Sequence, residues 1–371
     1  MGDYTLKDDV LALSKTDPEL AAVGTLPGRD GALLTPRQFL EKCPMKAGGF
    51  TDSPTDVMRK QTLDFERSLY ETTASLDIPE TVMTIAMRDG YESETRVFKP
   101  VSAPEAGSPL VVLIYGGGFV VGTSLQLVPF ARAIAKAYGA TVVAVSYRLA
   151  PECPFPAAPN DVWDSLKWVA ANATSLGADP SQGFVVGGVS AGGNLTCVAA
   201  QKAVKEKLSP PLTGIWVCIP VTTVTVEGLP EKYRDDWVSR TQNADALILS
   251  TADIDFLRDA YEPDAASEDF SPFVYPDVAA DIPPAFIQVA GMDPMRDDAL
   301  IYRRYLQEHG VKTRLNVYPG VPHSHHTLLP TLESSQNFRR DVVLGFGWLL
   351  GHELTADEVD EVAGAALDLC H

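Results

Sequence analysis

Cysteine is scarce in this chain and forms no motif. The 371 residues include five cysteines, spread along the sequence without a C-x-x-C pair. Such a pattern excludes a disulfide framework and a zinc ribbon. Long apolar runs are also missing, because stretches such as PLVVLIY have only the length of a β-strand, so we expect no membrane span. The first residues lack the apolar core of a secretory signal, and we therefore expect a cytoplasmic protein.

Basic residues are outnumbered by acidic ones. Lys and Arg total 30 against 49 Asp and Glu, which gives a formal net charge of −19. A surface this acidic repels phosphate groups, so nucleic acid and anionic membranes are excluded as expected partners. The apolar fraction of 45% and the charged fraction of 21% are ordinary globular values, which exclude disorder, collagen and coiled coil as the main architecture.

From about residue 80 the chain alternates short β-branched runs with helical patterns. The first two expected strands should form a hairpin around Asp89-Gly90. Alternation of this kind predicts an α/β fold, with a mostly parallel sheet covered by helices on both faces. The eight expected strands are 81–87, 95–99, 109–115, 141–145, 184–187, 214–219, 285–290 and 313–318.

Two stretches interrupt this alternation. Residues 1–75 are polar and helical in pattern, and residues 222–270 form an insertion whose helix opens on the capping-box sequence Ser250-Thr-Ala-Asp253. Insertions at the carboxyl edge of a sheet usually cover a site, so both stretches are predicted to form a cap over a core of residues 76–221 and 271–351. The tail, 352–371, opens on a second capping box and is predicted to be a helix packed on the body.

The segment Gly188-Val-Ser190-Ala-Gly192 follows an apolar run and precedes a helical stretch. This is the strand–turn–helix context of a nucleophile elbow, in which small flanking residues permit a sharp turn. Ser190 is therefore the predicted nucleophile. The alternative is a chance occurrence of a frequent pattern.

A serine nucleophile needs a base, and the loop His323-Ser-His325-His326 follows an expected strand. We predict that His323, just past a turn, is the base. The alternative interpretation for His325 and His326 is a pocket rim or a hydrated loop. No further ligands at suitable spacing support a zinc site at this cluster, so neither a metal nor a cofactor is predicted.

An orienting carboxylate is expected at another strand end. Asp293 follows the apolar run that starts at Ala285, whereas Asp297 and Asp298 begin the next helix, where acidic residues favour the macrodipole. The chain order Ser190, Asp293, His323 is that of α/β-hydrolases.

A glycine triplet, Gly116-Gly117-Gly118, follows the expected strand 109–115. Glycine lets backbone N–H groups approach a substrate oxygen without obstruction by Cβ. We predict that the N–H groups of Gly117, Gly118 and Ala191 form an oxyanion hole. The alternative is that the triplet is only a turn.

Residues 80–350 resemble the hormone-sensitive-lipase-like group of α/β-hydrolases, the fold-3 carboxylesterases. This resemblance implies the α/β-hydrolase fold with a helical cap and the activity of a carboxylesterase with a catalytic triad. It is carried by the segments Ser146-Tyr-Arg-Leu-Ala-Pro-Glu152, Ser190-Ala-Gly-Gly-Asn194, Ala290-Gly-Met-Asp293 and Tyr318-Pro-Gly-Val-Pro-His323.

Three positions depart from the pattern of that group. Tyr115 stands where the group usually has His before the glycines, Val189 where it often has Asp before the nucleophile, and Ser324 where it usually has Gly. Together with Gly116 and Phe119, the residues Tyr115 and Val189 are expected to line or support the pocket.

Three functions are therefore compared. The first is a serine hydrolase that cleaves a small or medium carboxylic ester or lactone through an acyl-enzyme. The alternative is a repurposed member that catalyses a cyclisation, elimination or acyl transfer in specialised, or secondary, metabolism. A ligand-binding receptor is disfavoured, because receptors of this group have lost the histidine and His323 is present. The expected partner is a small-molecule ester, lactone or related metabolite, and the choice between monomer and homodimer is left open.

Overall fold

The computed structural model describes residues 7–22, 26–27, 33–34, 54–73 and 77–369. Eight strands form one sheet in the order β10-β9-β8-β7-β5-β6-β4-β3. The predicted α/β fold with an eight-stranded sheet is confirmed. The strands are β3 (Glu80–Ala86), β4 (Glu92–Phe98), β5 (Leu110–Ile114), β6 (Thr141–Val145), β7 (Phe184–Val189), β8 (Gly214–Cys218), β9 (Ala285–Ala290) and β10 (Thr313–Tyr318).

Strand directions follow the expected mostly parallel pattern. β4 pairs antiparallel with β3 and β6. The other neighbours in the sheet, β6-β5-β7-β8-β9-β10, pair in parallel. Every residue of β5, β6, β7, β8 and β9 is buried. Coverage on both faces explains why these strands are continuously apolar in sequence.

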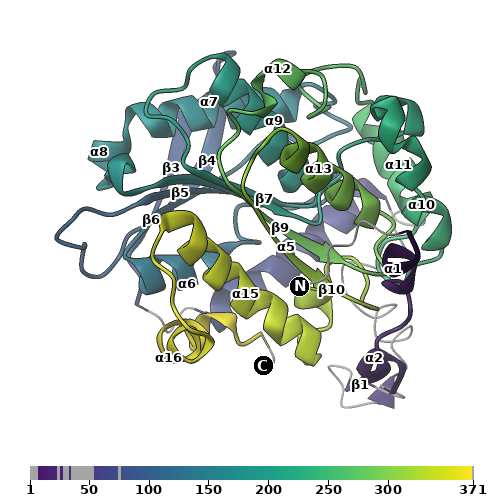
Figure 1. The fold of residues 1–371 in the computed structure, drawn as a ribbon. Helices are drawn as coiled ribbons and strands as arrows, with labels where there is room; N and C mark the ends of the chain where they lie inside the picture. The colour runs from purple at the N-terminus through teal and green to yellow at the C-terminus, as the bar shows by residue number, and fades with distance from the viewer. Residues whose placement is uncertain (1–6, 23–25, 28–32, 35–53, 74–76, 370–371) are drawn as a thin grey trace.

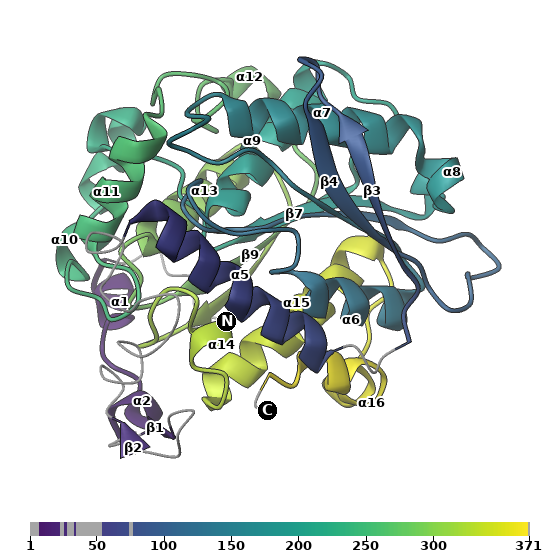
Figure 2. The same ribbon diagram turned by 180° about the vertical axis from the view of Figure 1, so that it is seen from behind.

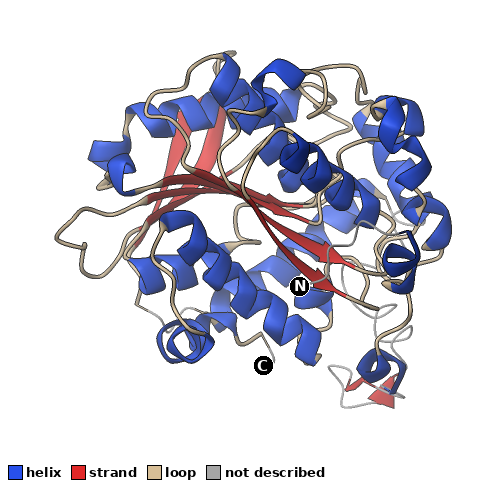
Figure 3. Ribbon diagram, in the orientation of Figure 1, coloured by secondary structure: helices blue, strands red, loops and turns tan. Residues whose placement is uncertain are grey.

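Helices cover both faces of the sheet (Figures 1 and 3). On one face lie α7 (Ala157–Ala171), α9 (Ala191–Lys205) and α13 (Arg296–Glu308), and on the other lie α6 (Val128–Tyr138), α15 (Glu333–Leu350) and α16 (Ala356–Leu367). The short connecting helices are α8 (Ala173–Leu176), α12 (Pro276–Ala279), α14 (His325–Leu328) and the 3₁₀ turns Pro180–Gln182, Val226–Gly228 and Glu231–Asp236.

The C-terminal segment forms the predicted helix, α16. It begins with the capping box of Thr355 and Glu358 and packs on α6 and α15, with Val359 and Ala363 buried. Its apolar face is therefore covered by the body of the protein.

Parts of the N-terminal segment and of the insertion line the cavity that also contains Ser190. The described N-terminal helices are α1 (Lys7–Ala12), α2 (Pro18–Ala22) and α5 (Thr55–Thr72), and Figure 2 shows α5 next to α6. A short antiparallel pair, β1 (Leu26–Pro27) and β2 (Leu33–Leu34), lies between α2 and α5 in the chain. The insertion contains α10 (Ser239–Gln242) and α11 (Thr251–Tyr261), the latter opened by the predicted capping box.

Across the described part of the chain, none of the helices combines the length and the apolar character needed to cross a membrane.

Two helical glycines predict opposite effects on stability. A Cβ on Gly345 of α15 would lie 2.0 Å from Cε1 of Phe286 in β9, whereas a Cβ on Gly364 of α16 would meet nothing within 4 Å. We expect Gly345→Ala to lower the free energy of unfolding by ~1–3 kcal/mol through overpacking. Gly364→Ala should raise it by up to ~1 kcal/mol through helix propensity. Denaturant unfolding measures both, and equal stabilities would contradict the packing of α15 on β9.

Candidate active site

Ser190 occupies a sharp turn between β7 and α9. Its backbone has φ 57° and ψ −115°, a conformation that lifts the side chain above the edge of the sheet. A Cβ at Gly188 would lie 2.3 Å from the Gly192 carbonyl oxygen, and a Cβ at Gly192 would lie 2.1 Å from the Ile114 carbonyl oxygen. Only glycine fits either position, which explains the pattern around Ser190.

Three predicted side chains meet in one chain of hydrogen bonds. Ser190 Oγ lies 3.1 Å from His323 Nε2, and His323 Nδ1 lies 2.5 Å from Asp293 Oδ2. Asp293 Oδ1 accepts a further bond of 2.8 Å from the Met295 N–H. With Asp293 as acceptor, Nδ1 carries the proton and Nε2 accepts from the serine hydroxyl. All three side chains are buried and come from the carboxyl ends of different strands.

The glycine loop borders the same cavity as Ser190. Gly117 has φ +126° and a Cβ there would lie 2.1 Å from the Val121 carbonyl oxygen, so the loop requires glycine at this position. Within the described residues, the N–H groups of Gly117 and Gly118 donate to no protein acceptor. Ala191 is the first residue of α9, and its N–H has no intrahelical acceptor. Gly117, Gly118 and Ala191 all line the cavity that also contains Ser190.

Tyr115 lies behind the glycine loop rather than in the cavity wall. Its hydroxyl donates to the Tyr147 carbonyl oxygen at 3.0 Å, and the Tyr147 hydroxyl donates to the Tyr115 carbonyl oxygen at 3.1 Å. The two rings stack with centroids 4.3 Å apart. Burial raises the pKa of Tyr115, so the phenol stays protonated as a donor. Tyr115 thus supports the loop from outside the cavity.

The other predicted pocket residues lie in the cavity wall. Gly116, Val189, Phe119 and Ser324 all line it. The Phe119 ring stacks on Tyr261 of α11 at 3.8 Å, which joins the glycine loop to the insertion. Ser324 has φ 55°, a left-handed conformation that glycine adopts at lower cost.

The cavity encloses about 1230 Å³ with its open mouth included. The strand ends, α5 and the insertion contribute to its wall, which is mainly apolar. Such a site favours uncharged ligands that present a few polar atoms. Its apolar side chains include Leu127, Phe130, Val221, Ile248, Leu249, Leu257, Phe270 and Met295.

A buried carboxyl group from α5 also lines this cavity. Glu66 is 1% exposed and accepts bonds from Thr123 Oγ1 at 2.6 Å and Gln126 Nε2 at 3.2 Å. Gln126 Oε1 in turn accepts a bond of 2.8 Å from the Gly116 N–H. Burial raises the pKa of Glu66 to about 7. The carboxyl therefore ties the N-terminal helix to the start of the glycine loop.

Glu66 and Gln126 were not singled out from the sequence, although one signal was present. Met58, Thr62, Glu66 and Leu69 are the buried residues of α5, and they recur at helical spacing on one face. A glutamate in such a stripe is unusual, because buried charges need partners. The partners of Glu66 lie some 60 residues further along the chain, where no local pattern reveals them.

Protein encloses the two histidines after His323, which contradicts a hydrated loop, whereas the interpretation as a pocket rim agrees with His326. His325 Nδ1 lies 3.1 Å from the Pro322 carbonyl oxygen, and burial lowers the pKa of His325 to about 3. His326 lines the cavity and stacks on Phe338 with centroids 4.1 Å apart. No three potential metal ligands gather among the residues that the structure describes.

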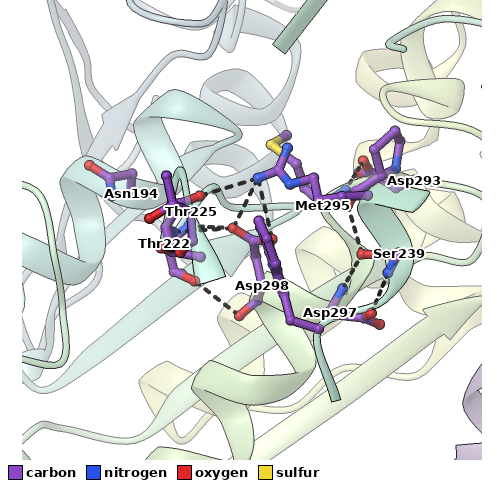
Figure 4. A network of polar contacts seen from close by, with 12 residues as sticks. Asn194, Thr222, Thr225, Ser239, Asp293, Met295, Asp297 and Asp298 are labelled. Atoms are coloured by element: carbon purple, nitrogen blue, oxygen red, sulfur yellow. Dashed lines mark hydrogen bonds and ion pairs between the residues drawn. The ribbon is translucent and has the colours of Figure 1, made fainter. Parts of the chain in front are cut away.

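Asp297 and Asp298 of α13 anchor the insertion beside Asp293 (Figure 4). Asp297 Oδ2 accepts from the N–H groups of Val238 and Ser239 at 2.7 and 2.6 Å. Asp298 Oδ2 accepts from Trp237 Nε1 at 2.9 Å. Both carboxylates thus hold the insertion against the core.

Known proteins with similar sequences share this architecture. A family model described as the alpha/beta hydrolase fold matches residues 111–327, more than half of the chain. The AB hydrolase superfamily protein B1A11.02 of Schizosaccharomyces pombe is 35% identical over 93% of this chain and 97% of that protein. Carboxylesterase NlhH of Mycobacterium tuberculosis is 40% identical over 64% of this chain and 73% of its own length.

The chain belongs to the hormone-sensitive-lipase-like family of α/β-hydrolase carboxylesterases. This confirms the predicted resemblance, and the protein is an esterase-like enzyme. Among solved structures, a vibralactone cyclase superposes with a TM-score of 0.79 at 30% identity, covering 92% of this chain and 96% of that one. Similarity within this family of carboxylesterases therefore extends to a protein named for a cyclisation.

The raised pKa of Glu66 predicts a pH-dependent stability. Between about pH 4.5 and 7 the unfolded chain loses the Glu66 proton while the folded chain keeps it, so stability falls as pH rises. Glu66→Gln removes this titration. As pH rises from about 4.5 to 7, the free energy of unfolding of Glu66→Gln should therefore increase by up to ~3 kcal/mol relative to that of the native chain. Denaturant unfolding at pH 4.5 and pH 8 measures the change. Glu71→Gln, at an exposed position of the same helix, is the control, and parallel curves for Glu66→Gln and the native chain would contradict the prediction.

Proposed function

We propose that the protein is a serine carboxylesterase that hydrolyses a small or medium uncharged ester or lactone through an acyl-enzyme on Ser190. The observation that carries this proposal is the chain of hydrogen bonds from Ser190 through His323 to Asp293, at 3.1 and 2.5 Å. A serine hydroxyl is a weak nucleophile unless an adjacent base accepts its proton. The neighbouring N–H groups of the glycine loop add a place for the developing negative charge.

In the first half of the reaction, Ser190 Oγ attacks the substrate carbonyl carbon while its proton passes to His323 Nε2. The carbonyl oxygen becomes an oxyanion that accepts hydrogen bonds from the N–H groups of Gly117, Gly118 and Ala191. The bond to the leaving oxygen then breaks, and His323 returns the proton to that oxygen. Asp293 stabilises the imidazolium throughout and holds the tautomer.

In the second half, water attacks the acyl-enzyme carbonyl carbon and gives its proton to His323 Nε2. Collapse of the second oxyanion breaks the bond to Ser190 Oγ, which regains a proton from His323, and the carboxylic acid leaves. The mainly apolar cavity favours substrates without a charge near the reacting group.

The alternative is that a hydroxyl of the substrate itself, rather than water, attacks the acyl-enzyme and closes a lactone. The likeness to a vibralactone cyclase over almost the whole chain favours this candidate. Reaction in ¹⁸O-labelled water distinguishes the two: hydrolysis places the label in the released acid, whereas cyclisation gives an unlabelled product.

Covalent labelling tests the nucleophile. A fluorophosphonate probe should modify the native chain at Ser190, as read by mass spectrometry, and Ser190→Ala should abolish the modification. The same substitution should lower kcat on an activated short-chain ester by on the order of 10⁶, because the serine and the base act as a unit. Activity of Ser190→Ala above about a tenth of the native value, far outside that expectation, would refute the assignment.

Substitution of two neighbouring aspartates tests the orienting acid. Asp293→Asn should lower kcat by about 10⁴ with an intact fold, because the wrong imidazole tautomer is then favoured. Asp297→Asn keeps an acceptor for the insertion and should stay within about tenfold of the native kcat. Circular dichroism checks the fold of both variants. A larger loss in a folded Asp297→Asn than in Asp293→Asn would transfer the role to Asp297.

A further inference from the structure

His326 is a buried imidazole in the cavity wall that the proposed reaction does not use. It is the second residue of α14, which begins just after His323 and Ser324, and is 3% exposed. Its backbone carbonyl accepts from Arg339 Nη1 at 2.7 Å, so its main chain is held in place. The ring is held as well, stacked on Phe338 at an interplanar angle of 8°.

The ring has polar atoms without a protein partner. Nδ1 is enclosed and has no hydrogen-bond partner in the described part of the chain, and no bond to Nε2 is found there either. A buried polar group without a partner carries a free-energy cost and calls for an explanation, such as a bound water or a ligand. Because the ring borders the cavity beside Ser190, a substrate can supply the missing partner.

The surroundings of His326 determine its charge and tautomer. Burial lowers the pKa of His326 well below its ordinary value, so the ring is neutral. A neutral imidazole carries one N–H and one acceptor nitrogen. A proton on the enclosed Nδ1 would have no acceptor, so the N–H belongs on Nε2, which is not among the enclosed atoms.

We infer that His326 Nε2 donates a hydrogen bond to an uncharged acceptor oxygen of the substrate, a hydroxyl or a carbonyl apart from the reacting ester group. His326 is thereby a specificity-determining residue for oxygenated esters or lactones. This inference rests on the proposed function, because it takes the cavity beside Ser190 as the substrate site.

A carboxylate substituent is a poorer match for this part of the cavity. The neutral ring offers no positive charge, and Glu66 lines the same cavity. Arg258 also lines it, but its guanidinium is already paired with Asp255 and Asp259. The ring of His326 itself has apolar neighbours, since it stacks on Phe338 and its centroid lies 6.2 Å from that of Phe130. A donor without any other partner discriminates well, because an analogue that lacks the oxygen leaves the donor unpaired.

Matched esters test the inference. Ethyl butyrate is compared with ethyl 3-hydroxybutyrate, ethyl 4-hydroxybutyrate and ethyl 3-oxobutyrate, and propyl butyrate with 2-hydroxyethyl butyrate, by pH-stat measurement of kcat/KM. The native enzyme should prefer at least one oxygenated ester by about tenfold over its partner. His326→Phe should abolish that preference while kcat/KM on the unsubstituted ester stays within about threefold, because only the polar contact is removed.

Neighbouring variants provide the controls. His325→Phe changes a buried histidine of the same helix whose ring is not part of the cavity wall, and should keep the preference. His326→Leu serves as a second variant if His326→Phe does not fold. A native enzyme without preference for any oxygenated ester, or a His326→Phe enzyme that keeps the native preference, would overturn the inference.

Binding to Ser190→Ala separates this inference from the proposed function. Calorimetric titration of the same ester pairs into Ser190→Ala, with and without His326→Phe, reads selectivity without turnover. If the native chain neither cleaves the esters nor reacts with a fluorophosphonate, the proposed function fails. Selective binding lost in His326→Phe would still support the role of His326, and unselective binding would refute it.

Discussion

The close approach of α9 to the carboxyl ends of β5 and β7 is the constraint on which the site depends. Gly192 faces the Ile114 carbonyl oxygen so closely that no Cβ fits between them. Ser190 is held at positive φ by this approach, a conformation that costs ~1–3 kcal/mol in a non-glycine residue. The buried packing of β7 and α9 offsets that cost. Any separation of these elements would move Ser190 from His323 and the Ala191 N–H from the glycine loop.

Segments outside the sheet are tied to the same edge by buried polar groups. Glu66 connects α5 to the glycine loop through Gln126, and Asp298 connects α13 to the insertion through Trp237. Burying these carboxyl groups is costly unless each donor is correctly placed. Such contacts therefore contribute to a defined position of the two segments more than to stability. The cavity takes its shape from parts of the chain that are far apart in sequence.

In the proposed function the fold supplies a reactive serine, and the cavity decides which molecule reaches it. The family includes proteins named as carboxylesterases, and a cyclase has the same architecture. In the proposed reaction, hydrolysis and cyclisation share the acyl-enzyme and differ only in the oxygen that attacks it. If the proposal holds, the few polar groups of the mainly apolar wall, such as His326, influence the outcome more directly than the groups around Ser190.

The sequence alone determined the sheet and predicted Ser190, Asp293 and His323, whose side chains the structure joins by hydrogen bonds. Strands covered on both faces are continuously apolar, a turn that admits no Cβ at positions 188 and 192 has glycine at both, and Asp293 and His323 follow strand ends. These are local patterns that a short stretch of chain displays. The tertiary structure decided that His325 and His326 are buried, that Tyr115 lies outside the cavity and that Glu66 reaches it. Whether a polar side chain is buried, and which groups it bonds, depends on contacts with residues distant in sequence. Glu66 with Thr123 and Asp298 with Thr222 are examples, and no local periodicity encodes such contacts.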